Sequence, residues 1–73
     1  MFDLPSRLKD LRKSKGITQK TFADLLGVFE QNYQRYELGS HMPNCETLIK
    51  LANCFGVSTD YLLGLTDNPE RNL

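Results

Sequence analysis

Tryptophan is absent from this 73-residue sequence, and cysteine and histidine are scarce, with two and one residues. No apolar run approaches the roughly 20 residues of a membrane span, and the N-terminus lacks the charged-then-apolar order of a signal peptide. We therefore expect no membrane contact and a cytoplasmic location. About 60% of the unfolded surface can be buried at this length, which allows one small domain and disfavours an enzyme with a deep cleft.

The scarce cysteine and histidine residues offer neither a disulfide nor a metal site. Cys45 and Cys54 lie nine residues apart on one expected helix, and about 13 Å of rise and opposite azimuths keep them from pairing. Cys45 falls on the apolar arc of that helix and is expected to fill the core, which leaves Cys54 as the more accessible thiol. His41 has no ligand-type residue beside it at the right spacing, so we expect no metal and no cofactor. The sequence does not indicate an enzyme, because it offers no nucleophile, base and orienting acid at credible positions.

Neither sign of charge is in excess, since nine Lys/Arg balance nine Asp/Glu. The balance hides a split along the chain. Through Lys20, six Lys/Arg stand against two Asp and give +4, whereas from Thr21 onward three Lys/Arg stand against seven Asp/Glu and give −4. Such asymmetry fits a protein that turns one end towards phosphate, although a basic first helix that is only solvated gives the same count.

The strongest pattern in the chain runs from Thr18 to Gly39. The hydroxyl of Thr18 can cap a helix, and Gly27 can take the left-handed conformation that ends one sharply. An advance of 100° per residue gathers the apolar residues between them on one arc of an amphipathic helix. These residues are Phe22, Ala23, Leu25 and Leu26.

A second helix is predicted almost at once, over residues 30–38. Its outward face carries Glu30, Gln31, Gln34, Arg35 and Leu38, and its other face carries Asn32, Tyr33, Tyr36 and Glu37. We expect the two tyrosine rings to lie in the core and at its rim, with their hydroxyls reaching solvent or phosphate. Two short helices joined by a Gly-containing turn, the second exposing Gln and Arg, are typical of a helix-turn-helix DNA reader. Residues 30–38 are therefore the predicted recognition helix.

Three further helices complete an all-α architecture of five helices. Residues 1–5 are a short arm that Pro5 ends by starting a helix that runs to about Lys15. A helix that follows Asn44 as its N-cap has an apolar arc of Cys45, Leu48, Ile49, Leu51, Ala52 and Phe55. A short helix over residues 59–63 is capped by Ser58. We assign residues 1–64 to the domain and residues 65–73 to a tail or linker.

The motifs of this sequence resemble those of the lambdoid phage repressor and Cro family, also called the xenobiotic-response-element type of bacterial regulator. The resemblance covers nearly everything from Arg7 to Gly64. The matching motifs are Arg7-Leu8-Lys9-x-Leu11-Arg12, Gly16-Ile17-Thr18-Gln19, Ala23-x-x-Leu26-Gly27-Val28, Tyr36-Glu37-x-Gly39, Pro43, Thr47-Leu48-x-x-Leu51-Ala52 and Gly56-Val57-Ser58-x-x-Tyr61-Leu62-Leu63-Gly64. The sequence departs from the family at Phe29, where Ser or Thr is usual, and at Tyr33, where Ile or Val is usual. The resemblance implies a five-helix lambda-repressor-like DNA-binding domain.

The expected contacts to DNA follow from the exposed arc and from this resemblance. Base contacts are assigned to the recognition helix and the residue before it, namely Phe29, Glu30, Gln31, Gln34 and Arg35. Phosphate contacts are assigned to Arg12, Gln19, Ser40 and His41. For Phe29 a hydrophobic staple is the alternative, and for Gln19 and His41 it is a solvated surface position. Glu30 either accepts from a cytosine amino group or selects against phosphate approach.

One ion pair is expected inside the domain. Arg12 projects at the edge of the apolar arc of the first helix, where an arginine needs a partner. Glu37, at the flank of the buried face of the recognition helix, is the best-placed acid, and the resemblance implies the same pair. We therefore predict that Arg12 and Glu37 form a structural pair.

The leading interpretation is a sequence-specific transcriptional regulator of the repressor type that binds a palindromic operator in double-stranded DNA. One recognition helix covers few base pairs, so a homodimer is expected, weak without DNA. The last helix carries an apolar excess, and the resemblance places the seam there, at Tyr61, Leu62, Leu63 and Leu65; Leu62 could instead complete the monomer core. The alternative is a protein-interaction module, of the antitoxin or anti-repressor type, that uses the same fold and binds through the acidic half.

Overall fold

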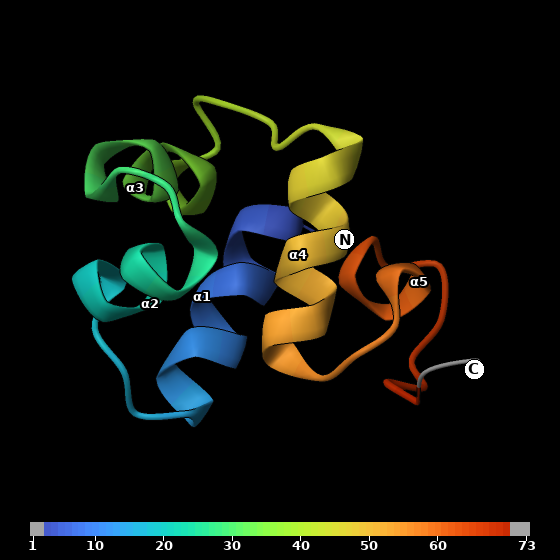
Figure 1. The fold of residues 1–73 in the computed structure, drawn as a ribbon. Coiled ribbons are helices and arrows are strands. Elements are labelled where there is room, and N and C mark those ends of the chain that lie inside the picture. Colours follow the sequence, from blue (N-terminus) through green and yellow to red (C-terminus); the bar gives the residue numbers. More distant parts are fainter. Residues whose placement is uncertain (1–2, 71–73) are drawn as a thin grey trace.

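The computed structural model describes residues 3–70. Residues 1–2 of the expected arm and residues 71–73 of the expected tail lie outside this range. Five helices and no strand occur in the described part of the chain, which confirms the all-α prediction (Figure 1). In chain order they are α1 (Leu4–Ser14), α2 (Gln19–Leu26), α3 (Glu30–Leu38), α4 (Cys45–Phe55) and α5 (Thr59–Leu62). None of the helices within residues 3–70 is both long and apolar enough to cross a membrane.

The predicted capping residues set the starts of three helices. The side chains of Thr18, Asn44 and Ser58 accept hydrogen bonds from backbone N–H groups in the first turns of α2, α4 and α5. At the other end of α3, Gly39 has a φ of 82°, a conformation that costs other L-residues free energy. A Cβ at Gly39 would also lie 3.3 Å from the Pro5 ring, so glycine is needed here both for the turn and for the close approach of α1.

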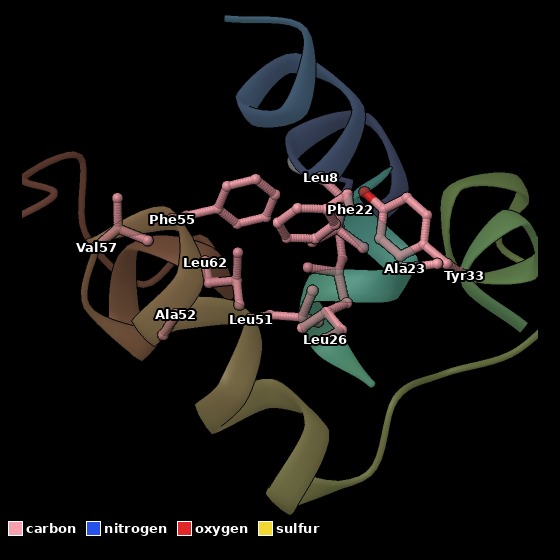
Figure 2. Packing of buried hydrophobic residues seen from close by; sticks show 11 residues of the cluster. Leu8, Phe22, Ala23, Leu26, Tyr33, Leu51, Ala52, Phe55, Val57 and Leu62 are labelled. Atoms are coloured by element: carbon pink, nitrogen blue, oxygen red, sulfur yellow. The ribbon is translucent and has the colours of Figure 1, made fainter. Parts of the chain in front are cut away.

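All five helices contribute buried side chains to the core. α1 packs against α3 and α5, and α2 packs against α3 and α4. At the centre the Phe22 ring stacks on Phe55 at 4.5 Å between centroids and meets Tyr33 edge-on at 5.1 Å (Figure 2). The buried apolar residues are Leu4, Leu8, Phe22, Ala23, Leu26, Tyr33, Leu51, Ala52, Phe55, Val57 and Leu62. One aromatic cluster therefore joins the helix-turn-helix to the C-terminal half.

The apolar arcs predicted for α2 and α4 are wider than the surfaces that the structure buries. Leu25 on α2 and Ile49 on α4 are exposed, and so is Cys45, which was expected in the core. The buried stripe of α4 consists of Leu51, Ala52 and Phe55. Cys45 and Ile49 lie outside that stripe, and Cys54 is exposed as well, so both cysteines are surface thiols.

The segment after α5 is not a simple tail. The backbone N–H of Leu65 donates to the Asp60 carbonyl at 2.8 Å, and the N–H of Ser58 donates to the Pro69 carbonyl at 3.0 Å. The chain therefore folds back beside α5 within the described residues (Figure 1). The boundary at residue 64 stays a prediction, but residues 65–69 are tied to the last helix.

Tyr33 corrects one expectation about the two aromatic residues of α3. Its side chain is completely buried, so its hydroxyl does not reach solvent as predicted, and this hydroxyl has no hydrogen-bond partner of acceptable geometry. Burial, followed by the adjacent Glu37 carboxylate, raises the pKa of the Tyr33 hydroxyl. Tyr36 is half-buried and meets the Tyr33 ring edge-on at 6.3 Å between centroids, as expected for a residue at the rim.

We predict that Tyr33→Phe raises the free energy of unfolding by up to about 1 kcal/mol, because a buried hydroxyl without a good partner costs free energy. Chemical denaturation measures the change, and Tyr36→Phe, at the rim of the same cluster, serves as the control. A loss of more than about 1 kcal/mol in Tyr33→Phe would contradict this and show that the hydroxyl supports Glu37.

Candidate nucleic-acid interface

The helix-turn-helix is formed by α2, a short turn and α3. Ala23 on α2 is fully buried where the two helices pack, and its small side chain permits their close approach. The turn is closed by the Val28 N–H, which donates to the Ala23 carbonyl at 3.1 Å. α3 therefore leaves α2 at an angle fixed by backbone contacts and a small buried residue.

The outward face of α3 is the one predicted from the sequence. Glu30, Gln31, Arg35 and Leu38 are exposed and Gln34 is half-buried. The Gln34 amide donates to the Glu30 carboxylate at 3.3 Å, and the Arg35 guanidinium donates to the Asn32 amide oxygen at 3.5 Å. Both contacts are long and solvent-exposed, so these donors can exchange them for other acceptors at small cost.

Phe29 occupies the N-cap position of α3 without capping it. No side-chain hydrogen bond caps this helix, and 80% of the Phe29 surface is exposed. The hydrophobic staple is therefore the wrong alternative for this residue. Beside it lies a shallow, open depression lined by Asp24, Gly27, Val28, Phe29 and Asn32. The ring stands free at the tip of α3, and a contact with a thymine methyl group stays a prediction.

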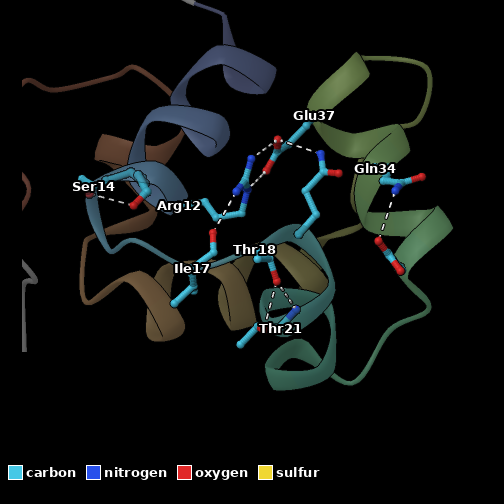
Figure 3. A network of polar contacts seen from close by, with 10 residues as sticks. Arg12, Ser14, Ile17, Thr18, Thr21, Gln34 and Glu37 are labelled. Carbon is cyan, nitrogen blue, oxygen red and sulfur yellow. Dashed lines mark hydrogen bonds and ion pairs between the residues drawn. The ribbon is translucent and has the colours of Figure 1, made fainter.

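A buried polar cluster joins α3 to α1 and α2 (Figure 3). The Arg12 Nε donates to one Glu37 oxygen at 2.7 Å and Nη2 donates to the other at 3.2 Å, which confirms the predicted pair. Arg12 also donates to the Ile17 carbonyl at 2.8 Å. Only 11% of the Arg12 side chain and 4% of the Glu37 side chain are exposed. The pair therefore ties the end of α1, the following loop and α3 together.

Gln19 adds a contact that the sequence reasoning missed. Its amide donates to the Glu37 carboxylate at 3.1 Å, so the first residue of α2 joins the same cluster. The sequence did hold a signal for this contact. Gln19 and Arg12 were both assigned to the DNA-facing edge and both carry N–H donors, so the acid that binds one of them could also bind the other. Its phosphate contact remains a prediction, because the second N–H of the amide lies outside this bond and can donate to a phosphate oxygen.

The cluster shifts the protonation equilibria of its members. Burial alone would raise the pKa of Glu37, but the hydrogen bonds from the Arg12 guanidinium and the Gln19 amide, together with the Arg12 charge, outweigh burial and lower it. The hydrogen bond to Glu37 raises the pKa of Arg12 against the opposing effect of burial. Both groups are therefore held in their charged forms at neutral pH.

The loop after α3 presents polar side chains at its surface. Ser40 and His41 are exposed, and their backbone N–H groups donate to the Arg35 carbonyl at 3.1 and 3.4 Å. The backbone of the loop is thus held by the helix end, whereas the two side chains stand in solvent. Their assignment to phosphate stays a prediction. Among residues 3–70, no three metal-binding side chains gather into a site.

The four residues assigned to a dimer seam have different environments. Leu62 is fully buried within the single chain, so it has no surface to offer a partner, and its assignment is corrected to the monomer core. Tyr61 is half-buried and has the Arg7 guanidinium 3.9 Å above its ring. Leu63 is half-buried, and Leu65 is 73% exposed. Tyr61, Leu63 and Leu65 remain predicted interface residues.

Comparison with known families identifies the fold. A helix-turn-helix family, HTH_3, matches residues 8–62, which include all of α2 to α5 and most of α1. The chain belongs to this helix-turn-helix family. The motifs that carried the resemblance in the sequence fall in the matched region.

Similar proteins include helix-turn-helix transcriptional regulators, one of them prophage-derived. The SPbeta prophage-derived uncharacterized HTH-type transcriptional regulator YonR of Bacillus subtilis (strain 168) is 53% identical over 57 residues, covering 78% of this chain and 53% of that protein. The HTH-type transcriptional regulator ImmR of the same strain is 42% identical, covering 94% of this chain and 54% of ImmR. This helix-turn-helix chain thus spans about half the length of the curated relatives it matches.

A solved structure shares the arrangement of the helices. The P22 c2 repressor protein, crystallised in complex with the synthetic operator 9T, is similar with a TM-score of 0.80 and 27% identity. The match covers 85% of this chain and 94% of that chain. The five-helix lambdoid repressor architecture expected from the motifs is confirmed.

We predict that Glu37→Ala lowers the free energy of unfolding by roughly 3–5 kcal/mol, because it leaves the buried Arg12 charge without its partner. Denaturant titration measures the loss. The matched control is Glu46→Ala, which removes the exposed Glu46–Lys50 pair at 3.9 Å and should cost less than about 1 kcal/mol. Equal small effects in the two variants would contradict a structural role for the buried pair.

The pH dependence of the same variant gives a second measurement. Since folding lowers the pKa of Glu37, the stability from this carboxylate is complete above its unfolded pKa and is lost as pH falls through the folded pKa. The difference between wild type and Glu37→Ala should therefore narrow in acid. A difference that stays constant down to the acid transition would indicate that the charge of Glu37 is not what stabilises the fold.

Proposed function

We propose that this chain is the sequence-specific DNA-binding domain of a transcriptional regulator of the repressor type. The observation that carries the proposal is the exposed face of α3, where Gln31 and Arg35 project from the second helix of a helix-turn-helix. Several relatives are named HTH-type transcriptional regulators, and the P22 c2 repressor is described in complex with an operator. An isolated polar helix face would suit many partners, but on this motif it suits the major groove.

Base contacts and backbone contacts come from different parts of the motif. Gln31 and Arg35 are free to reach base edges, since a glutamine pairs well with adenine and an arginine with guanine. Gln34 reaches a base or the sugar-phosphate, and its bond to Glu30 leaves its amide oxygen available. Arg12, Gln19 and the Ser40–His41 loop contact phosphate and set the register of α3 in the groove.

The proposal is tested by selecting bound sites from random DNA and titrating the selected duplex against salt. Phosphate neutralisation predicts an affinity that falls linearly with salt on logarithmic axes. Enrichment of one site, together with such a slope, supports DNA reading. If no site is enriched and affinity does not change with salt, the result favours the alternative function. In that alternative the chain is a protein-interaction module that keeps the fold and binds a protein partner.

We predict that Arg35→Ala relaxes base preference at one position per half-site and costs about 1–3 kcal/mol of binding free energy there. Competition titrations with the selected site and its single-base variants measure this. Lys50→Ala on α4, which also removes one exposed positive charge, is the control. If Arg35→Ala weakens cognate and scrambled DNA equally, Arg35 contacts only phosphate.

Two copies of the chain are proposed to share a palindromic operator. A single α3 contacts too few base pairs for a specific site, and helix-turn-helix dimers place half-sites about 34–36 Å apart. Leu65 is 73% exposed and is held next to α5 by its hydrogen bond to Asp60. One exposed leucine with its half-buried neighbours favours only a small isologous contact. The free protein is therefore mostly monomeric, and DNA promotes pairing by mass action.

We predict that Leu65→Glu abolishes cooperative binding to a two-half-site operator but leaves monomer stability and binding to one half-site unchanged. The reason is that Leu65 is exposed in the single chain, so the new charge is desolvated only in the dimer. Gel-shift titrations on operators with one and two half-sites measure the difference, with Leu25→Glu, on the exposed side of α2, as a control for a lost surface leucine. Cooperativity that persists in Leu65→Glu would place the seam elsewhere.

A further inference from the structure

Lysine is unevenly distributed over the surface. Of the five lysines, four lie between residues 9 and 20, and all four are exposed. Within residues 3–70 none of these four forms an ion pair, whereas Lys50 lies 3.9 Å from Glu46. We define Lys9, Lys13, Lys15 and Lys20 as the basic strip. Asp10 is the one acidic residue in this stretch, and it makes no ion pair with the strip.

Two lysines of the basic strip directly follow residues of the buried polar cluster in the chain. Arg12 on α1 and Gln19 on α2 both bond to Glu37 on α3. Lys13 follows Arg12 in the chain, and Lys20 follows Gln19. On α1, an advance of 100° per residue puts Lys9 and Lys13 on the side of Arg12 away from the apolar arc. Lys13 and Lys20 therefore directly follow residues that bond to α3, and all four lysines of the strip are exposed to solvent.

The rest of the proposed contact surface offers little positive charge to DNA. The loop after α3 has Ser40, His41 and Met42, with no lysine or arginine. The chain from Thr21 onward carries a net charge of −4. Arg35 projects from the face of α3 assigned to bases. Since duplex binding depends on neutralised phosphates, the cations for it must come mainly from residues 9–20.

We propose that the basic strip binds the DNA backbone next to the groove that α3 enters, and so supplies most of the sequence-independent affinity. This rests on the proposed function. The flexible, exposed lysine side chains are point charges suited to phosphates. They carry no base information, so they act on all sequences alike. The strip thus supplies affinity for any duplex, and α3 supplies the preference for one sequence.

The test compares single lysine-to-glutamine variants by salt titration. Lys13→Gln and Lys20→Gln are measured on the selected site and on a random duplex, and Lys50→Gln on α4 is the control with the same charge change. Each lost phosphate contact should reduce the slope of log affinity against log salt by about 0.9. Between 50 and 200 mM salt this is about a 3.5-fold smaller loss of affinity per variant.

The outcomes separate the strip from the proposed function. The assignment of the strip to phosphates is supported if Lys13→Gln and Lys20→Gln reduce the salt slope on both duplexes and keep the preference for the selected site. Lys50→Gln should leave the slope unchanged. Unchanged slopes in the strip variants, or an equal reduction in Lys50→Gln, overturn the strip while wild-type binding upholds the function. A wild-type chain that binds neither duplex overturns the function and the strip together.

A neutral backbone provides a second measurement on the wild-type protein. Methylphosphonate linkages placed one at a time along the selected site remove single phosphate charges without changing a base. Wild type should lose affinity at the linkages that the strip contacts, and Lys13→Gln or Lys20→Gln should lose nothing further at one of them. Additive losses at every linkage would overturn the assignment of these lysines.

Discussion

The buried ion pair between Arg12 and Glu37 is the constraint on which the arrangement of the motif depends. Arg12 at the end of α1 and Gln19 at the start of α2 both donate to the Glu37 carboxylate on α3, and Arg12 also donates to the Ile17 carbonyl in the loop between α1 and α2. A buried pair is a weak source of net stability, because desolvation offsets much of the attraction. Its geometry is directional, however, and apolar packing is not. The pair therefore specifies how α3 is oriented on α1 and α2, which a core of leucines and phenylalanines alone would leave less defined.

α3 has to satisfy two opposing demands within nine residues. Its inner side anchors the core through Tyr33, which packs against Phe22, while its outer side leaves Gln31 and Arg35 in solvent. A helix this short gains little stability of its own, so the outward polar residues depend on the inward contacts. Tyr33 fills the space but leaves its hydroxyl poorly bonded. The buried Tyr33 hydroxyl therefore lowers the free energy of unfolding at the place where α3 is anchored. This matters in a domain that can bury only a marginal area.

Most of the helices, their caps and the Arg12–Glu37 pair could be predicted from the sequence, because periodicity, capping residues and a charge at a core edge are local signals. Burial was predicted less well. Periodicity indicates which side of α4 is apolar, but not how far its neighbours reach around it, so Cys45 and Ile49 were placed in the core although they are exposed. The bond from Gln19 to Glu37 and the return of the chain to Pro69 depend on long-range geometry that no local pattern encodes. The base, phosphate and dimer assignments stay predictions, since they concern partners that a single chain does not include.

A net charge of zero is compatible with DNA binding if the charges are separated in space. Through Lys20 the chain carries +4, and the remainder carries −4. Charges farther apart than the Debye length, about 8 Å at physiological ionic strength, are largely screened from one another when exposed. The domain measures 29 × 25 × 23 Å along its principal axes, so acidic groups on the far side do little to cancel the potential near the basic strip. A phosphate next to the basic strip therefore experiences a local positive surface, which favours approach to this part of the domain. On the proposed function, overall neutrality limits non-specific attraction at long range and leaves more of the discrimination to α3.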